Sequence, residues 1–255
     1  MRTALPEDGL QGYKSKSQMA RVATEAWALR NLYCPRCTSP RLSASPANTP
    51  VIDYNCPSCA ASFQLKAQSH VLSHRIVDSA YAQMIRAIRE DGIPNLFAIH
   101  YDSSRWVVLN LILIPHFAFP LSAIEKRKPL GPDARRAGWV GCNILLDAIP
   151  RDARIPVISE GRPVSPEQVR KHYSRIQPLE KLPTEKRGWT LDVLNIVRSL
   201  ERDTFDLADI YANDHKLAAL HPQNRHVRDK IRQQLQILRD VGILEFLGGG
   251  EYRIK

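Results

Sequence analysis

Apolar and polar residues alternate along the first half of the chain in a pattern typical of a mixed α/β domain. Residues 17–31 repeat apolar side chains at helical spacing after Ser17, a residue type suited to cap a helix. Short runs rich in β-branched and aromatic residues predict strands. The expected elements are a helix at 17–31, a short strand at 51–55, a strand at 63–67, a helix at 76–91, and strands at 96–102 and 106–115. This order predicts an α/β fold around one apolar sheet.

Two further patterns follow beyond residue 150. Prolines at five positions predict a stretch of low order, ending in the linker LPTEKRG: Pro156, Pro163, Pro166, Pro178 and Pro183. From Trp189 onward helical spacing returns, and the chain closes with two short strands joined by three glycines in GILEFLGGGEYRIK. Helices followed by a hairpin are the layout of a winged helix-turn-helix. We therefore predict one domain at 1–183 and a second at 184–255.

Charge and composition narrow the function. The 255-residue chain has a formal net charge of +10, which indicates a polyanionic partner, with general solubility as the alternative. Residues 184–255 contain 12 Lys and Arg against 11 Asp and Glu, so the excess lies mostly in the first part. No apolar run approaches the roughly 20 residues that span a bilayer, and the N-terminus lacks the apolar core of a signal peptide. We expect a cytoplasmic protein without a membrane partner.

Four of the five cysteines form two matched pairs. Cys34-Pro-Arg-Cys37 and Cys56-Pro-Ser-Cys59 are separated by eighteen residues. Each pair is suited to bind one tetrahedral cation from a tight turn, and four thiolates suit zinc in a closed, structural site. A redox-active pair is the alternative, although redox chemistry does not require two matched pairs. The remaining Cys142 is expected to be buried and inert.

Around the second cysteine pair lies a candidate nuclease motif. Asp53 is followed after ten residues by Gln64-Leu65-Lys66, close to the D…(D/E)-x-K pattern of metal-dependent nucleases. Side-chain oxygens of Asp53 and Gln64 and the backbone carbonyl of Leu65 are candidate magnesium ligands. Strand alternation places Gln64 and Lys66 on one face, where the lysine can orient or deprotonate a water. A surface strand without function is the alternative, since this short pattern also arises by chance.

The sequence also resembles the DpnI-type family of methyl-directed type II restriction endonucleases. Long strings carry the resemblance: GYKSKSQMARVATEAW at 12–27, EKRKPLGPDARRAGWVGCNI at 125–144 and KIRQQLQILRD at 230–240. It implies a PD-(D/E)XK nuclease domain with an embedded zinc site, followed by a winged helix. It further implies cleavage of double-stranded DNA at GATC with methylated adenine in a prokaryotic cytoplasm. Asp53 and Lys66 fall on the family's catalytic aspartate and lysine. We take a monomer as the working expectation.

Gln64 departs from the family pattern, which has glutamate there. A neutral amide still offers an oxygen to magnesium but brings no charge, so metal binding should weaken. Three interpretations stay open. The site works with glutamine, or the substitution has disarmed the enzyme and left a reader of methylated DNA, or Glu25 on the first helix supplies the missing carboxylate. A zinc-ribbon transcription regulator is a further, less favoured alternative.

Two stretches are candidates for DNA contact. On a helix predicted at 225–239, four arginines fall within an arc of roughly 60°, beside Gln236: Arg225, Arg228, Arg232 and Arg239. Guanidiniums suit phosphates and guanine edges, and glutamine suits adenine. A solvated helix face is the alternative. In the first domain, Arg135, Arg136 and Trp139 combine two cations with a flat apolar ring that suits a base methyl, or else a place in the core.

Overall fold

The computed structural model describes residues 1–46 and 49–255. These residues form two compact units, each assembled from several chain segments. The first comprises Met1–His74, Pro94–His116 and Ala153–Ser174, and the second comprises Arg75–Ile93, Phe117–Asp152 and Arg175–Lys255. The sequence predicted two continuous domains with a boundary between residues 183 and 184. The two units are built from several segments each, so they do not test this boundary, which stays a prediction. None of the described helices is both long enough and apolar enough to cross a membrane.

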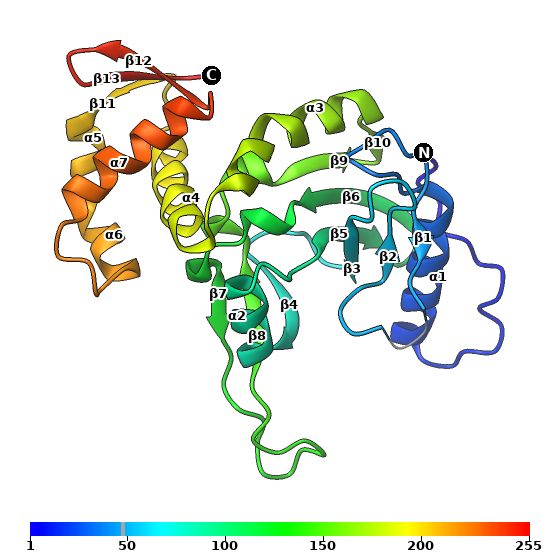
Figure 1. Cartoon of the computed structure of the whole chain (residues 1–255). Helices are drawn as coiled ribbons and strands as arrows, with labels where there is room; N and C mark the ends of the chain where they lie inside the picture. Colours follow the sequence, from blue (N-terminus) through cyan, green and yellow to red (C-terminus); the bar gives the residue numbers. More distant parts are fainter. Residues whose placement is uncertain (47–48) are drawn as a thin grey trace. The chain divides into compact units, whose positions relative to one another are not determined.

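A mixed β-sheet forms the centre of the first unit (Figure 1). Within the described part of the chain its strands, in spatial order, are β1 (Ser43–Ala44), β2 (Tyr54–Asn55), β3 (Ser62–Gln68), β5 (Asn95–Asp102), β6 (Val107–Ile114), β9 (Ile155–Ser159) and β10 (Arg162–Pro163). Strands β3 and β5 are parallel, and β5 and β6 form an antiparallel hairpin. Residues 95 to 101 are all buried, as expected for a central strand. The strands predicted at 63–67, 96–102 and 106–115 are therefore confirmed within a residue or two.

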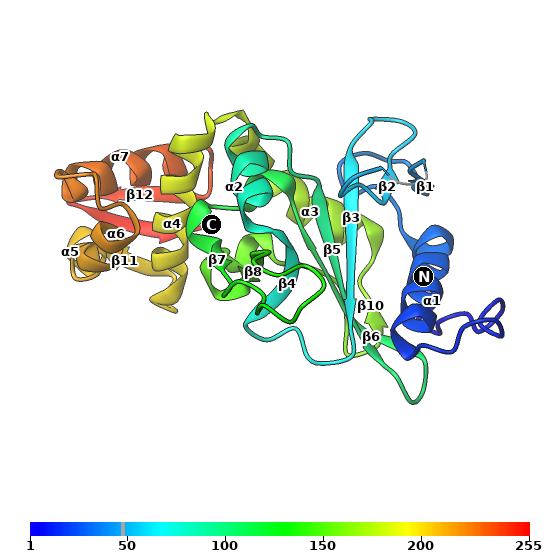
Figure 2. The same ribbon diagram turned by 90° about the horizontal axis from the view of Figure 1, so that it is seen from below.

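Two helices accompany this sheet. Helix α3 (Pro166–Ile176) covers one face and lies behind the sheet in the view of Figure 2. The Tyr173 hydroxyl donates a hydrogen bond to Asn95 at 3.3 Å, and the same face carries the stacked pair Phe63 and Phe97 with ring centroids 5.4 Å apart. Helix α1 (Lys16–Asn31) packs against β3 and buries Trp27 completely. The mixed α/β character predicted for this part of the chain is confirmed.

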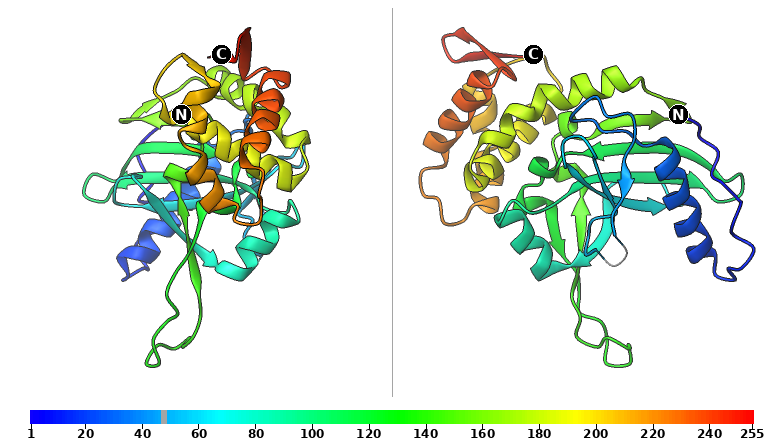
Figure 3. Two further views of the ribbon diagram at one scale, coloured as in Figure 1. Left: turned by 90° about the vertical axis from the view of Figure 1, so that its left-hand side faces the viewer. Right: turned by 45° about the vertical axis from the view of Figure 1, so that its right-hand side comes forward.

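A smaller antiparallel sheet lies in the second unit, with its strands in the order β4, β8, β7. Their bounds are β4 (Arg75–Ala80), β7 (Ile124–Lys126) and β8 (Gly141–Leu145), and α2 (Tyr81–Arg89) packs on this sheet through Met84 and Ile88. The segment between β7 and β8 extends well beyond the ends of both strands (Figure 3). Short 3₁₀ turns occur at His116–Ala118, Leu121–Ala123, Leu146–Ala148, Arg151–Ala153 and Gln177–Lys181.

The C-terminal part of this unit is a helical domain with a small sheet. Its elements are α4 (Thr184–Ser199), β11 (Thr204–Asp206), α5 (Leu207–Tyr211), α6 (Asp214–Leu220), α7 (Val227–Asp240), β12 (Leu244–Gly248) and β13 (Glu251–Ile254). The predicted core residues Ile231, Leu235 and Leu238 on α7 are fully buried, whereas Val227, at the first turn, is only half-buried. Strands β12 and β13 form the predicted hairpin, and β11 adds a third strand that the sequence did not reveal.

Some local predictions were wrong. Residues 76–80 form β4 rather than the start of a helix, because they pair with β8, more than sixty positions away. The proline-rich stretch is ordered, because each proline occupies a place that needs no N–H. Pro163 lies in the edge strand β10, Pro166 begins α3, and Pro156 sits beside a register irregularity. Helix α1 begins at Lys16, and its N-cap is Ser15, so Ser17 is not the cap.

Helix α4 is tied to the rest of the second unit by charged contacts. Arg198 donates to both carboxylate oxygens of Asp152, through Nε at 2.6 Å and through a second short bond. Both side chains are nearly buried, with 13% and 10% of their surface exposed. Arg187, also buried, pairs with Asp91. Removing one partner of such a pair leaves an uncompensated charge in a poorly solvated place.

We expect Arg198→Met to lower the free energy of unfolding of the full chain by about 3–5 kcal/mol, because Asp152 is then buried without a partner. Urea denaturation measures the loss. The matched control is Arg202→Met: Arg202 pairs with Asp209, but its side chain is 54% exposed, so the expected loss is below about 1 kcal/mol. Equal losses in the two variants would contradict the structural role of the buried pair.

Candidate active site and DNA-contacting surfaces

The two cysteine pairs converge on one cluster. All four sulfur atoms lie within 4.8 Å of one another, with Cys34 Sγ 3.6 Å from Cys59 Sγ and Cys37 Sγ 3.5 Å from Cys56 Sγ. The pairs are brought together because the first follows α1 and the second lies in the turn between β2 and β3. Four sulfur donors at this spacing are suited to hold one tetrahedral metal ion such as zinc.

Backbone groups support the sulfur cluster. Burial by itself raises the pKa of the Cys56 thiol, but N–H donors of Cys59 and Ser58, together with the neighbouring thiols, lower that pKa to about 6. A lowered pKa favours the thiolate, the form that binds metal, whereas burial raises the pKa of the Cys34 and Cys59 thiols. From α3, the Arg170 guanidinium donates to the carbonyl oxygens of Cys34 and Cys37 at 3.2 and 2.8 Å. The cluster therefore links α1, the β2–β3 turn and α3.

Cys142 is not a member of this cluster; it belongs to β8 of the second unit. It is fully buried, as predicted, and its thiol donates to the carbonyl of Ser79 at 3.3 Å.

The residues of the nuclease-like motif lie together at β2 and β3. The Asp53 carboxylate accepts a hydrogen bond from the Leu65 N–H at 2.7 Å, and the Asp53 N–H donates to the carbonyl of Phe63 at 2.9 Å. Asp53 is thus held directly beside β3. Gln64 is 7% exposed and Lys66 half-buried; strand alternation places both on one face, and in the parallel register Lys66 lies opposite the small residue Ala98.

Glu25 reaches the same place from α1. Burial raises the pKa of Glu25; Arg21, 3.9 Å away, lowers it, and the negative charge of Asp53 raises it again. The Tyr54 hydroxyl also donates to the backbone carbonyl of Glu25 at 3.2 Å. The first helix therefore brings a second carboxylate into electrostatic range of Asp53. Its partly buried position differs from that of a fully solvated helix residue.

The predicted arginine stripe is exposed, with Gln236 beside it, but α7 begins at Val227, so Arg225 lies before the helix and only Arg228, Arg232 and Arg239 are on it. Three of its guanidiniums already pair with nearby carboxylates: Arg228 with Asp214 at 2.8 Å, Arg232 with Asp229, and Arg239 with Asp240 at 2.8 Å. Arg225 forms no ion pair with any residue that the structure describes. These carboxylate partners account for the nearly balanced charge of residues 184–255, although α7 itself is rich in arginine. The pairs are exposed and weak, so a phosphate is able to replace the carboxylate.

The segment between β7 and β8 holds Trp139 in a defined position. The Arg136 guanidinium lies 4.8 Å from the ring centroid, and the backbone N–H of Trp139 donates to the backbone carbonyl of Arg136 at 3.0 Å. The indole also lies against Gly141, where an added Cβ would be 2.8 Å from two ring atoms. Arg135 and Arg136 are exposed and Trp139 is half-buried. The ring is thus neither a core residue nor freely mobile.

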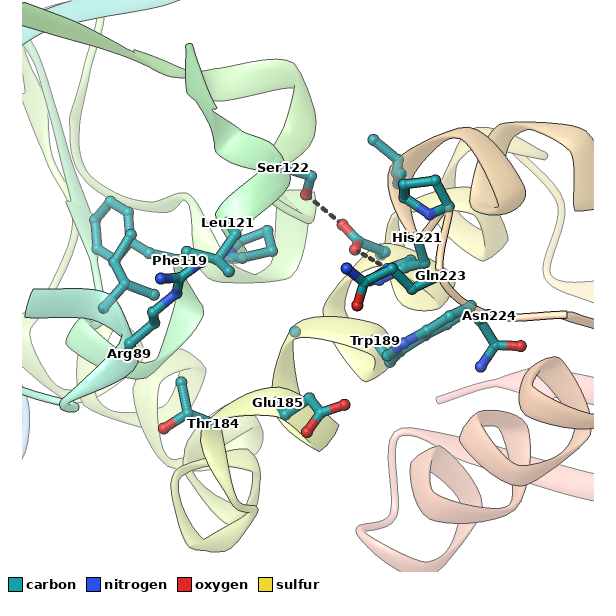
Figure 4. A pocket seen from close by; sticks show the side chains of 16 residues that line it. Arg89, Phe119, Leu121, Ser122, Thr184, Glu185, Trp189, His221, Gln223 and Asn224 are labelled. Carbon is teal, nitrogen blue, oxygen red and sulfur yellow. Dashed lines mark hydrogen bonds and ion pairs between the residues drawn. The ribbon is translucent and has the colours of Figure 1, made fainter. Parts of the chain in front are cut away.

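A cavity of about 780 Å³ in the second unit has no predicted site residue among its lining residues (Figure 4). On its wall the buried Asp192 accepts hydrogen bonds from Ser122 Oγ at 2.5 Å and from His221 Nε2 at 2.8 Å. The His221 ring stacks on Trp189 at a centroid distance of 3.6 Å. The contacts join residues up to 70 positions apart, so no sequence pattern identifies them.

These features define a class: a mixed α/β domain carrying a four-cysteine cluster, followed by a helix-turn-helix domain that acts on DNA. Residues 1–182 match the DpnI, Dam-replacing family, and residues 185–254 match the Dam-replacing HTH domain. The chain belongs to the DpnI, Dam-replacing family, a family of restriction endonucleases. The resemblance recognised in the sequence is confirmed, and DNA is the partner that the family and the HTH domain indicate.

The cysteine cluster leads to a test by metal removal. We expect the purified chain to carry a single zinc ion, and chelation or Cys59→Ser to lower its thermal unfolding midpoint, because the metal replaces core packing in this small module. Atomic absorption and thermal denaturation measure both effects. Cys142→Ser is the control and should keep the zinc. Full retention of zinc by Cys59→Ser would contradict the assignment of the cluster.

Proposed function

We propose that the protein is a methylation-dependent type II restriction endonuclease that cleaves double-stranded DNA at GATC carrying methylated adenine. The reaction is magnesium-dependent hydrolysis of a phosphodiester bond in a PD-(D/E)XK nuclease domain at 1–183. A winged helix at 184–255 provides a second contact with DNA. The family membership supports the general activity, and the particular residues named below support its details.

The hydrogen bond from the Leu65 N–H to the Asp53 carboxylate is the observation that carries this proposal. It fixes Asp53 beside the strand whose one face presents Gln64 and Lys66. The oxygens of Asp53 and Gln64 and the Leu65 carbonyl are the hard donors that magnesium prefers, so this donor set fits the ion. When bound, magnesium supplies positive charge that stabilises the phosphate during displacement. Lys66 orients the attacking water and takes up or shares its proton.

Glu25 compensates for the neutral side chain at position 64. A carboxylate at position 64 would add charge directly, whereas Gln64 offers a dipole alone. Glu25 places its charge within electrostatic range of Asp53 from a separate helix. Burial is the main cause of its raised pKa, and the negative charge of Asp53 adds to the cost of keeping Glu25 ionised without a cation. A bound cation relieves that cost, so the working site is Asp53, Gln64, Leu65 and Lys66 with Glu25 in support.

Recognition of the methylated site is assigned to two surfaces. Arg225, just before α7, and Arg228, Arg232 and Arg239 on that helix bind phosphates and guanine edges, and Gln236 reads adenine. In the first sequence domain, Arg135 and Arg136 bind phosphates while Trp139 contacts the methyl group of adenine in the major groove. One methyl group contributes only about 1–3 kcal/mol of discrimination. Two methyl groups per palindrome and two reading surfaces together give a usable selectivity.

The alternative function is a reader of methylated GATC that no longer cleaves. The observation that favours it is the neutral, nearly buried Gln64. Zinc at the four-cysteine cluster serves a structural role in both functions.

The decisive variants change the charge at position 64. We expect Gln64→Glu to lower the magnesium concentration for half-maximal cleavage by roughly tenfold or more, because a carboxylate adds about 1–4 kcal/mol of attraction for a nearby cation. Binding to methylated DNA in metal-free buffer should change little. Asp53→Ala and Lys66→Ala should reduce cleavage by about 10²–10⁴-fold. Quantitative cleavage of a methylated duplex measures each effect.

Glu25→Gln tests the supporting carboxylate in the same assay. A severe loss in Glu25→Gln, together with a small gain in Gln64→Glu, would show that the helix carboxylate already supplies the charge. Cleavage restored only in Gln64→Glu would show a disarmed nuclease and favour the reader. Absence of cleavage in both, with methylated DNA still bound, would refute the enzyme.

Gly141→Ala tests the assigned role of Trp139 without changing the tryptophan itself. The new methyl group occupies the place of the indole edge, so the ring must move away from Gly141 while the strand register is kept. We expect the preference for methylated over unmethylated GATC to fall by roughly ten- to a hundredfold in a binding assay. Gly131→Ala, in open space on the same segment, is the control. An unchanged preference would contradict the reading role of Trp139.

A further inference from the structure

His100 lies on the same face of the sheet as the residues of the candidate active site. In the parallel register of β3 and β5, Lys66 is opposite Ala98 and Gln68 is opposite His100. Paired residues of neighbouring strands point to the same face, so Gln64, Lys66 and His100 share it. Along this face, three successive pairs of residues are Gln64 with Leu96, Lys66 with Ala98, and Gln68 with His100. We call each such pair a row, so His100 lies one row beyond Lys66. Successive rows are two residues apart, which corresponds to about 6.7 Å along a strand.

The position of the proton on His100 follows from its neighbour on β6. Asn110 Oδ1 accepts a hydrogen bond from the Glu160 N–H at 3.0 Å, which fixes the orientation of the amide. The other end of that amide, Nδ2, must then donate to His100 Nδ1, 3.1 Å away. Because Nδ1 is an acceptor, a neutral His100 carries its proton on Nε2.

The surroundings also favour a neutral ring. Burial lowers the pKa of His100; the carboxylate of Asp102 raises it, and His70 lowers it again. The ring is 8% exposed. Its Nε2 is nevertheless not among the fully buried side-chain atoms that lack a partner, so this N–H reaches solvent, where a ligand oxygen can accept from it. The His100 Nε2–H donates to no group in residues 1–46 and 49–255.

Two details of the surroundings set this N–H apart from ordinary core packing. The amide of the neighbouring Gln68 is turned away, since its Nε2 donates to the carbonyls of His70 and Val71 at 3.1 and 3.2 Å. A register irregularity between β5 and β6 falls at His100 and Tyr101. Such bulges occur next to active sites, where they re-aim a side chain.

We propose that His100 binds the DNA strand being cut, by donating its Nε2–H to a non-bridging oxygen of a phosphate adjacent to the cleaved one. The inference rests on the proposed function and adds a contact one row along the strand from Lys66. Neighbouring phosphates of one DNA strand are separated by a distance similar to one such row. A neutral donor holds the phosphate without releasing counterions, so it fixes the register of the strand rather than adding general affinity.

The test combines a changed side chain with a changed phosphate. Methylated GATC duplexes carry one uncharged methylphosphonate at each phosphate flanking the cut, and cleavage is followed as kcat/KM. For the natural chain we expect one of these positions to reduce cleavage by roughly ten- to a hundredfold, as for loss of a hydrogen bond to a charged group. His100→Ala should show the same loss on unmodified DNA and no further loss with that methylphosphonate. His100→Gln, which keeps a donor, should recover part of the activity.

The control is His70→Ala, an exposed histidine on the nearby turn, which should cleave normally. The slope of the logarithm of DNA affinity against the logarithm of salt concentration should be the same for His100→Ala and the natural chain. Loss of a cationic contact to phosphate would instead reduce the magnitude of this slope by about one. A nitrogen-15 NMR spectrum of the imidazoles should show His100 as the neutral form protonated at Nε2. A proton on Nδ1 of the neutral ring overturns the assignment, whatever the chain does to DNA.

The two proposals fail in different ways. Normal cleavage by His100→Ala overturns the role of His100 and leaves the proposed nuclease activity intact. The same conclusion follows if the loss caused by His100→Ala multiplies with the loss caused by the methylphosphonate at every position. If the natural chain binds methylated DNA without cutting, the same comparison is made with dissociation constants in metal-free buffer and judged by the same criteria. If the chain neither binds nor cuts, both proposals are wrong.

Discussion

The convergence of four cysteine sulfurs organises the part of the molecule that carries the candidate active site. The cluster joins the end of α1 to the turn between β2 and β3, and Arg170 ties the same turns to α3. Each acid of the candidate site is attached to one of these elements: Glu25 to α1 and Asp53 to the start of β2. β2 and β1 are only two residues long, and sheet hydrogen bonds alone give such strands little stability. The four-sulfur cluster, which is suited to hold a metal ion, ties these short strands to α1 and α3.

Neutralisation of charge is a second constraint that recurs through the molecule. The buried cations Arg187 and Arg198 each have a carboxylate partner, as burial of an isolated charge requires. On the exposed face of α7 the arginines also have partners, but these pairs are solvated and exchangeable. The same residue type therefore stabilises the fold where it is buried and remains open to exchange with an external anion where it is exposed. Burial, rather than sequence, separates the two roles.

Much of the fold and of the candidate site could be predicted from local sequence. The strands β3, β5 and β6 and the core of α7 follow from apolar spacing, which depends on neighbours a few positions away. The four-cysteine cluster follows from two matched pairs of cysteines, and the family follows from long strings. The strand β4 and the order of the proline-rich stretch could not be predicted, because pairing with β8 and edge positions in the sheet decided them. Asp192 with Ser122 and His221 left no local signal at all.

The sequence by itself determined which chemical groups are present: four thiols in paired turns, an aspartate followed by Gln64 and Lys66, and a stripe of arginines. These depend on residue identity and on periods of two or about 3.6 residues, which the chain carries locally. Tertiary structure decided which of these groups meet. It brought Glu25 toward Asp53, set Trp139 between Arg136 and Gly141, and placed His100 on the face of Lys66 with its proton directed by Asn110. Such meetings arise from strand register and helix packing between distant segments, and no local pattern encodes them.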